Sequence, residues 1–134
     1  MAQLLNSKFR AWDRESKRML YPSTEDVYFQ LTNNGIIVFD LSIAPYDEIY
    51  PIFESVIIMQ STKIQDYKHP EKDIIQGDIV EDRAGTKYIV RYNEDFCANC
   101  LYLGEEMHMM FYPNIELTVV GNEYENPELL EVEK

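Results

Sequence analysis

The chain has 134 residues, which fits a single domain over residues 1–134. It carries 24 acidic and 12 basic residues, and the formal net charge of −12 makes nucleic acid an unfavourable partner because it repels phosphate backbones. The sequence has no apolar run of about 18 residues that would span a membrane, and no signal peptide is visible. We therefore expect a cytoplasmic protein with reduced thiols and without membrane contacts.

The composition favours strands over helices. Ten tyrosines and six phenylalanines suit pleated, half-buried surfaces. Apolar residues at 9–12 and 19–21 flank a polar stretch, which predicts an opening hairpin. Phe9 and Trp12 cannot share a face of one ideal strand, so we expect a bulge near Ala11 or a strand that ends there.

The next elements are set by turn residues. Asn33-Asn34-Gly35 separates the β-branched and aromatic runs 27–31 and 36–39, and this pattern predicts a hairpin. Residues 42–55 contain two prolines and little periodicity, so we expect a loop or peripheral segment. A buried strand is predicted at 56–60, followed by a polar loop at 61–73.

The second half of the chain shows further strands. A turn at 76–78 leads into a strand at 79–82, and a turn at 83–86 leads into an alternating strand at 87–92. That alternation places Tyr88, Val90 and Tyr92 on one face. A last strand is predicted at 115–120.

Two C-terminal segments have patterns that favour helices. In residues 96–112 a stripe fits a helix but is weakened by Gly104; it comprises Leu101, Tyr102, Glu105, Met109 and Tyr112. Asn126 and Pro127 have the order of an N-cap and a first helical residue, so a short helix is expected there.

Three blocks of sequence together resemble the YopX family of phage and prophage proteins. They lie at 8–13 with Met19, at 59–62 followed by Asp66 and 77–80, and at 120–130. The sequence departs from the family pattern at Lys63, where a glycine is usual, and in the loop that follows.

The resemblance implies a phage or prophage origin in a bacterial host and a β-rich fold. It also implies that the C-terminal half is similar to a small SH3-like barrel. We accordingly expect a mostly-β, α+β fold with N-terminal hairpins, an SH3-like barrel and a short C-terminal helix. The resemblance assigns no function, supplies no catalytic residues and implies no cofactor.

Cys97 and Cys100 form a CxxC pair, which in other proteins clamps zinc or forms a redox pair. A structural zinc site needs four ligands, and there is no second CxxC. With His108 as a third ligand, the pair supports a metal-binding protein or a small metal-dependent enzyme as an alternative function. Two cysteines without a special role are the simpler interpretation.

Carboxylates and aromatic residues offer other candidate sites. The five acidic doublets are typical of a solvated surface, because adjacent acids in a strand point to opposite faces. Asp13 and Gly77-Asp78 have the residue types of ordinary turns. Trp12 and Tyr124 are candidate anchors for a partner, although core burial also explains them.

The leading hypothesis is a non-enzymatic interaction protein that binds a basic host or phage protein. A nucleic-acid-binding SH3-like barrel is a third alternative. We also expect a homo-oligomer, because residues 42–55 and 96–112 hold large apolar side chains, among them Phe53 and Phe111, that no clear element buries.

Overall fold

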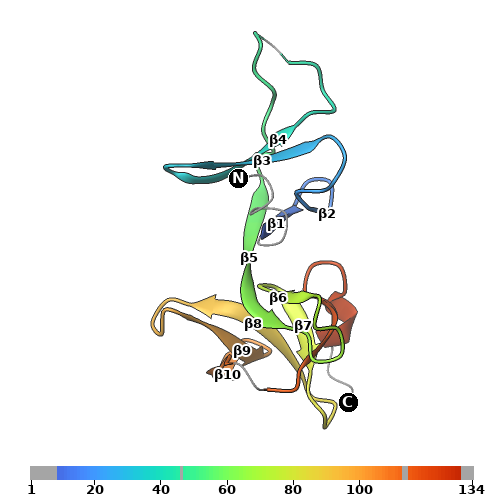
Figure 1. Cartoon of the computed structure of the whole chain (residues 1–134), viewed down its shortest axis with the longest axis vertical. Coiled ribbons are helices and arrows are strands. Elements are labelled where there is room, and N and C mark those ends of the chain that lie inside the picture. Colours follow the sequence, from blue (N-terminus) through green and yellow to red (C-terminus); the bar gives the residue numbers. More distant parts are fainter. Residues whose placement is uncertain (1–8, 46, 113–114, 131–134) are drawn as a thin grey trace. The chain divides into compact units, whose positions relative to one another are not determined.

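The computed structural model describes residues 9–45, 47–112 and 115–130, and its regular structure is almost entirely β (Figure 1). This confirms the mostly-β expectation. The strands, in chain order, are β1 (Phe9–Asp13), β2 (Arg18–Leu20), β3 (Val27–Thr32), β4 (Gly35–Asp40), β5 (Val56–Gln65), β6 (Asp73–Ile75), β7 (Asp78–Glu81), β8 (Lys87–Asn93), β9 (Ala98–Leu103), β10 (Glu106–Met110) and β11 (Thr118–Asn122). In the described part of the chain, no helix is long and apolar enough to cross a membrane.

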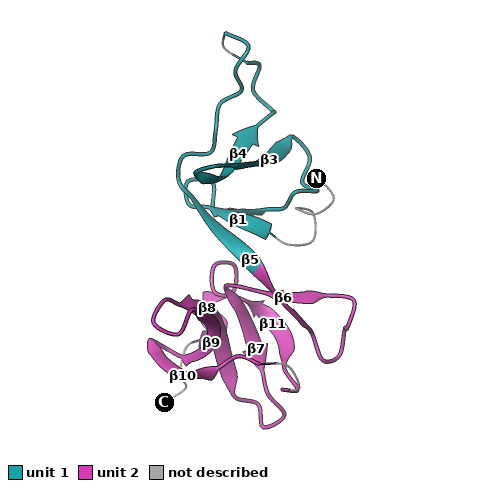
Figure 2. Ribbon diagram, turned by 60° about the vertical axis from the view of Figure 1, so that its left-hand side comes forward, with its two compact units in different colours: residues 1–60 teal, residues 61–134 magenta. Residues whose placement is uncertain are grey.

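The chain divides into two compact units, residues 1–60 and residues 61–134, which Figure 2 colours separately. Strand β5 belongs to both. Its residues 56–60 pair with β1 in unit 1, and Ser61 and Gln65 pair with β6 in unit 2. That the two units form one folding domain stays a prediction.

Unit 1 contains the two hairpins predicted at the N-terminal end. Strands β1 and β2 pair antiparallel, and β3 and β4 pair from Val27↔Asp40 to Thr32↔Gly35 around Asn33 and Asn34. The apolar side chains of the inner faces form one core, because alternate residues of a strand point to the same face. That core comprises Ala11, Leu20, Val27, Phe29 and Val38.

The irregularity expected near Ala11 is absent. Strand β1 runs without a register shift through Asp13 and pairs with β2 on one side and β5 on the other. Phe9 and Trp12 therefore lie on opposite faces of a regular strand, and each is half-buried. The expectation was wrong because both faces of β1 are partly covered, so the two aromatic residues need not share one.

Unit 2 is built on a curled, five-stranded antiparallel sheet in the order β10-β9-β8-β7-β11 (Figure 2). The strands and turns predicted between residues 76 and 92 are confirmed. Tyr88 and Val90 point into the core, while Tyr92 at the end of β8 is 50 % exposed. The core comprises Ile74, Val80, Tyr88, Val90, Leu101, Phe111 and Leu117.

The prediction of a polar loop at 61–73 is wrong at both ends of that range. Strand β5 continues through Gln65, and Asp73 begins β6. Polar side chains hold this part of the sheet: the Thr62 hydroxyl donates to the Ile74 carbonyl at 2.7 Å, and the Ser61 hydroxyl donates to the Asp73 carboxylate at 2.6 Å. A pattern that looks for apolar alternation does not detect a strand stabilised in this way.

The helical stripe considered for residues 96–112 is a β-hairpin. Strands β9 and β10 pair around a turn in which Gly104 has a φ of 62°, a value that favours glycine. The hairpin places Leu101 opposite Met109 and Tyr102 opposite Met107. Of these pairs, Leu101 and Met109 would also have shared one face of a helix.

The predicted C-terminal helix is, in the described residues, one turn of 3-10 helix, η1 (Pro127–Leu130). Asn126 occupies the N-cap position, because its carbonyl accepts a hydrogen bond from the Leu129 amide at 3.1 Å. Its side-chain Oδ1 accepts a hydrogen bond from the amide of Asn122 at 3.1 Å. A side chain at Gly121 would collide here, since an added Cβ would lie 2.7 Å from Asn126 Oδ1 and 2.9 Å from Leu129 Cδ1.

Lys63 occupies a backbone conformation that suits glycine. Its φ is 63°, inside a strand whose register with β6 shifts between Ser61 and Gln65. Lys63, where the family usually has a glycine, therefore has a left-handed backbone conformation. A residue other than glycine in this conformation costs about 1 kcal/mol or more.

We expect Lys63→Gly to raise the free energy of unfolding, measured by chemical denaturation, by about 1 kcal/mol relative to Lys63→Ala. Both variants remove the same exposed side chain, but only glycine relieves the backbone strain. A Lys63→Ala protein as stable as Lys63→Gly would contradict this explanation.

Candidate interaction surfaces

Two buried aspartates in the sequence blocks that resemble the YopX family, Asp13 and Asp78, accept hydrogen bonds that close turns. Asp13 is 5 % exposed, and its carboxylate accepts hydrogen bonds from the Glu15 amide at 3.2 Å and the Ser16 hydroxyl at 2.5 Å. Asp78 is 4 % exposed and accepts from the Ile75 amide at 2.8 Å. The prediction of ordinary turn chemistry at these aspartates is confirmed.

The carboxylate of Asp66 also accepts hydrogen bonds from main-chain amides, and one of these donors lies far away in the sequence. Its Oδ1 accepts hydrogen bonds from the amides of Lys68 and His69, at 2.8 and 3.0 Å. Its Oδ2 accepts from the amide of Val119 in β11 at 2.7 Å. The adjacent Tyr67 amide donates to the Leu117 carbonyl at 2.9 Å. These bonds tie the segment that follows β5 to β11, next to the edge of the curled sheet.

The third block folds around Asn122, which is 6 % exposed. Its Oδ1 accepts from the amides of Tyr124 and Glu125, at 3.1 and 2.8 Å, and its Nδ2 donates to the Glu125 carboxylate at 2.7 Å. The block is therefore a turn built on one buried amide. Its close packing against Gly121 gives the block a structural role.

Arg91 links this turn to the sheet. Its guanidinium donates to the Glu123 carboxylate at 2.9 Å, and it lies 3.9 Å from a carboxylate oxygen of Glu105. The guanidinium carbon is 5.7 Å from the centre of the Tyr102 ring. The hydrogen bond with Glu123 raises the pKa of Arg91 above its usual value. The positive charge of Arg91 is thereby paired with carboxylates of the same chain, and it neutralises part of the acidic charge beside β9 and β10.

The proposed metal ligands do not converge. Cys97 is exposed in the turn before β9, whereas Cys100 is fully buried within that strand. His108 is exposed at the bulge of β10 and stacks on the Tyr88 ring, with centroids 5.4 Å apart. Over residues 9–45, 47–112 and 115–130 there is no group of three His, Cys, Asp or Glu side chains placed to hold a metal ion. Burial also raises the pKa of the Cys100 thiol, which makes it a poor nucleophile.

The four aromatic residues considered as anchors differ in burial. Phe111 packs in the core of unit 2 at 8 % exposed, so it is not available to a partner in this structure. Trp12 and Tyr124 are half-buried. Phe53 packs against the core of unit 1, and the guanidinium carbon of Arg18 lies 6.0 Å from its ring centre.

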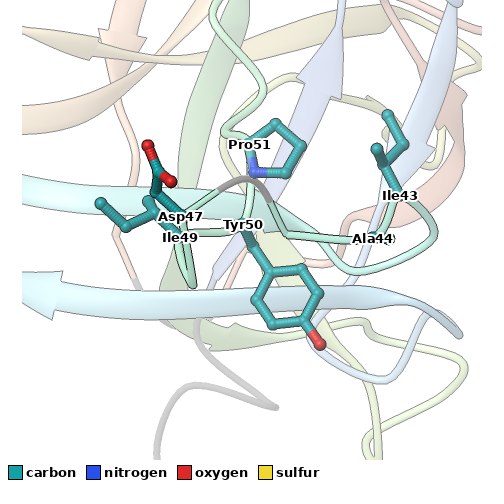
Figure 3. A pocket seen from close by; sticks show the side chains of 6 residues that line it. All are labelled: Ile43, Ala44, Asp47, Ile49, Tyr50 and Pro51. Atoms are coloured by element: carbon teal, nitrogen blue, oxygen red, sulfur yellow. The ribbon is translucent and has the colours of Figure 1, made fainter.

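The most exposed apolar side chains in unit 1 lie on the β3–β4 hairpin and the loop that follows it. The loop forms an open groove of about 500 Å³ lined by Ile43, Ala44, Asp47, Ile49, Tyr50 and Pro51. In the view of Figure 3, Tyr50 and Pro51 lie between Ile43 on one side and Asp47 with Ile49 on the other. Ile49 is 68 % exposed and Ile43 is 53 % exposed. We call this feature the loop groove.

A second exposed apolar surface lies at the β10 edge of the sheet in unit 2. It comprises Met107 and Met110, which share a face with their cross-strand partners Tyr102 and Cys100, and Tyr112, which follows the strand; the three are between 36 % and 51 % exposed. We call it the β10 surface. Sequence reasoning had placed apolar contacts in residues 96–112, but it singled out Phe111 because aromatic identity alone does not reveal which face of a segment is buried.

Comparisons with known proteins agree on the fold. The crystal structure of yopX from Bacillus subtilis is similar with a TM-score of 0.63 at 20 % sequence identity, covering 96 % of this chain and 99 % of that one. The crystal structure of protein EF1440 from Enterococcus faecalis is similar with a TM-score of 0.50 at 25 % identity, covering 92 % and 97 %. No curated protein matches the chain. The model of the YopX protein family matches residues 8–131, and the chain therefore belongs to that family.

Proposed function

We propose that this chain is a non-enzymatic interaction protein, encoded by a phage or prophage and working in the bacterial cytoplasm. The observation that carries the proposal is the location of its exposed apolar side chains. Several of them gather on the loop groove and the β10 surface, and exposed apolar groups gathered in this way usually mark contacts. The buried acidic and amide side chains of the family blocks, by contrast, are engaged in turns; these are Asp13, Asp66, Asp78 and Asn122. In this proposal unit 2 is an SH3-like barrel that serves as a binding scaffold.

Self-association is assigned to the β10 surface. Strand β10 lies at one end of the five-stranded sheet, and an edge strand with apolar side chains is a natural site for pairing with another chain. The charge nearby is partly balanced, because Arg91 contacts both Glu105 and Glu123. Two copies can therefore approach here with less repulsion than the net charge of −12 suggests.

Light scattering after gel filtration should give the wild-type protein a mass that is a multiple of 15.8 kDa. Combining Met107→Glu with Met110→Glu should reduce that mass to one chain, since burying the new carboxylates in an apolar contact is unfavourable. Leu31→Glu is the matched control, because Leu31 is 58 % exposed in unit 1. A wild-type mass of one chain across the micromolar range would end the proposal of self-association.

The competing hypothesis gives the CxxC pair a redox or metal-binding role, and thiol titration separates the two. In the native protein we expect one thiol, that of Cys97, to react with a disulfide reagent, and the buried Cys100 to react only after unfolding. Cys97→Ser should abolish the native reaction, whereas Cys100→Ser should leave it intact. Two unreactive thiols in the native protein, recovered by reductant or chelator, would favour the competing hypothesis.

A further inference from the structure

The loop groove lies in a part of the sequence that contains no basic residue. Between Met19 and Thr62 there is no lysine, arginine or histidine, while the acids in the same span are Glu25, Asp26, Asp40, Asp47, Glu48 and Glu54. Asp47 lines the groove, and Glu48 is exposed beside it. No ion pair within the described residues engages either carboxylate. The groove is thus apolar in its lining and acidic at its rim.

The apolar surface extends from the groove onto the neighbouring hairpin. Ile52, next to the groove residue Pro51, forms a β-bridge with Phe39 in β4 and is 47 % exposed. Phe39 contacts Tyr28 across the hairpin, with ring centroids 6.2 Å apart, and Tyr28 is 48 % exposed. Apolar side chains therefore continue across the outer face of the hairpin. This continuity suits an extended segment, which contacts several side chains in turn.

We infer that the loop groove binds a segment of a protein partner in which large apolar side chains alternate with lysine or arginine. The inference rests on the proposed function and adds the site and the chemistry of the partner. Apolar side chains of the segment would occupy the groove, while its basic side chains would face Asp47 and Glu48. Pairing of opposite charges across a contact supplies specificity and speeds association.

The acidic charge at the rim of the loop groove also disfavours the other molecules that could occupy the groove. A second copy would bring the same acidic rim and no base from residues 19–62, so like charges would face each other. Nucleic acid would place its phosphates beside Asp47 and Glu48, and this arrangement is repulsive as well. A basic segment is the occupant whose charge matches the rim.

The test uses isothermal titration calorimetry with the full chain and a short peptide in which leucine alternates with lysine, at about 0.15 M salt. We expect binding that is weakened about fivefold to tenfold by the pair Asp47→Asn and Glu48→Gln. The matched control is the pair Glu94→Gln and Asp95→Asn, an exposed doublet in unit 2 that changes the net charge by the same amount. This control should alter the affinity by no more than about twofold. A peptide with glutamate in place of lysine should not bind.

The apolar part of the site is tested in the same way. Ile49→Ser should weaken peptide binding, whereas Phe96→Ser, at a position of unit 2 that is 50 % exposed and outside the β10 surface, should not. Equal weakening by both doublet variants would show a long-range charge effect and would overturn the inference, as would a wild-type protein that does not bind the peptide. A fall in oligomer mass caused by Ile49→Ser would assign the groove to a second copy instead. If peptide binding is absent but the wild-type mass is still oligomeric, the inference fails while the proposed function stands.

Discussion

One buried carboxylate in unit 2, that of Asp66, joins two segments that lie far apart in the sequence. Asp66 is 3 % exposed and accepts hydrogen bonds from three main-chain amides, two in its own loop and one in β11. A buried charge is tolerated only when it is well hydrogen-bonded, so these three donors must be held in place together. The segment that leaves β5 is thereby fastened to β11, which lies at the opposite end of the sheet from β10. Strand β10 is left at the other end, and this is where we assign self-association.

Hydrogen bonds between segments that are far apart in the sequence also explain which parts of the fold the sequence could predict and which it could not. The hairpin around Asn33-Asn34-Gly35 and the strands from residue 78 to 93 were predictable, because turn residues and apolar alternation act locally. Strand β6 and the end of β5 were missed because serine and threonine hydroxyls stabilise them. The hairpin at 98–110 was ambiguous because Leu101 and Met109, which pair across it, also fit a helical stripe. Pattern alone does not reveal such long-range pairings.

The candidate surfaces were predicted as segments but not as residues. The buried polar side chains of the described structure are Arg10, Asp13, Asp66, Asp78 and Asn122, and all of them fall in the three blocks that resemble the YopX family. The family signal therefore records how the chain folds, which is why it pointed to a fold without an activity. The exposed large apolar side chains, such as Ile49 and Met110, lie outside those blocks except for Val120. Their exposure depends on strand faces and loop paths that a single sequence does not specify.

Amide hydrogen exchange, followed by NMR in the wild type and in Asp66→Asn, tests the central role of this carboxylate most directly. The amide group can accept hydrogen bonds through one oxygen only, so one set of main-chain donors loses its partner. The account predicts that the amides of Val119 and Tyr67 lose at least about tenfold of their protection, while those of β3 and β4 in unit 1 keep theirs. Unchanged protection at Val119, Tyr67, Lys68 and His69 alike would contradict the claim that the Asp66 carboxylate fastens the segment after β5 to β11.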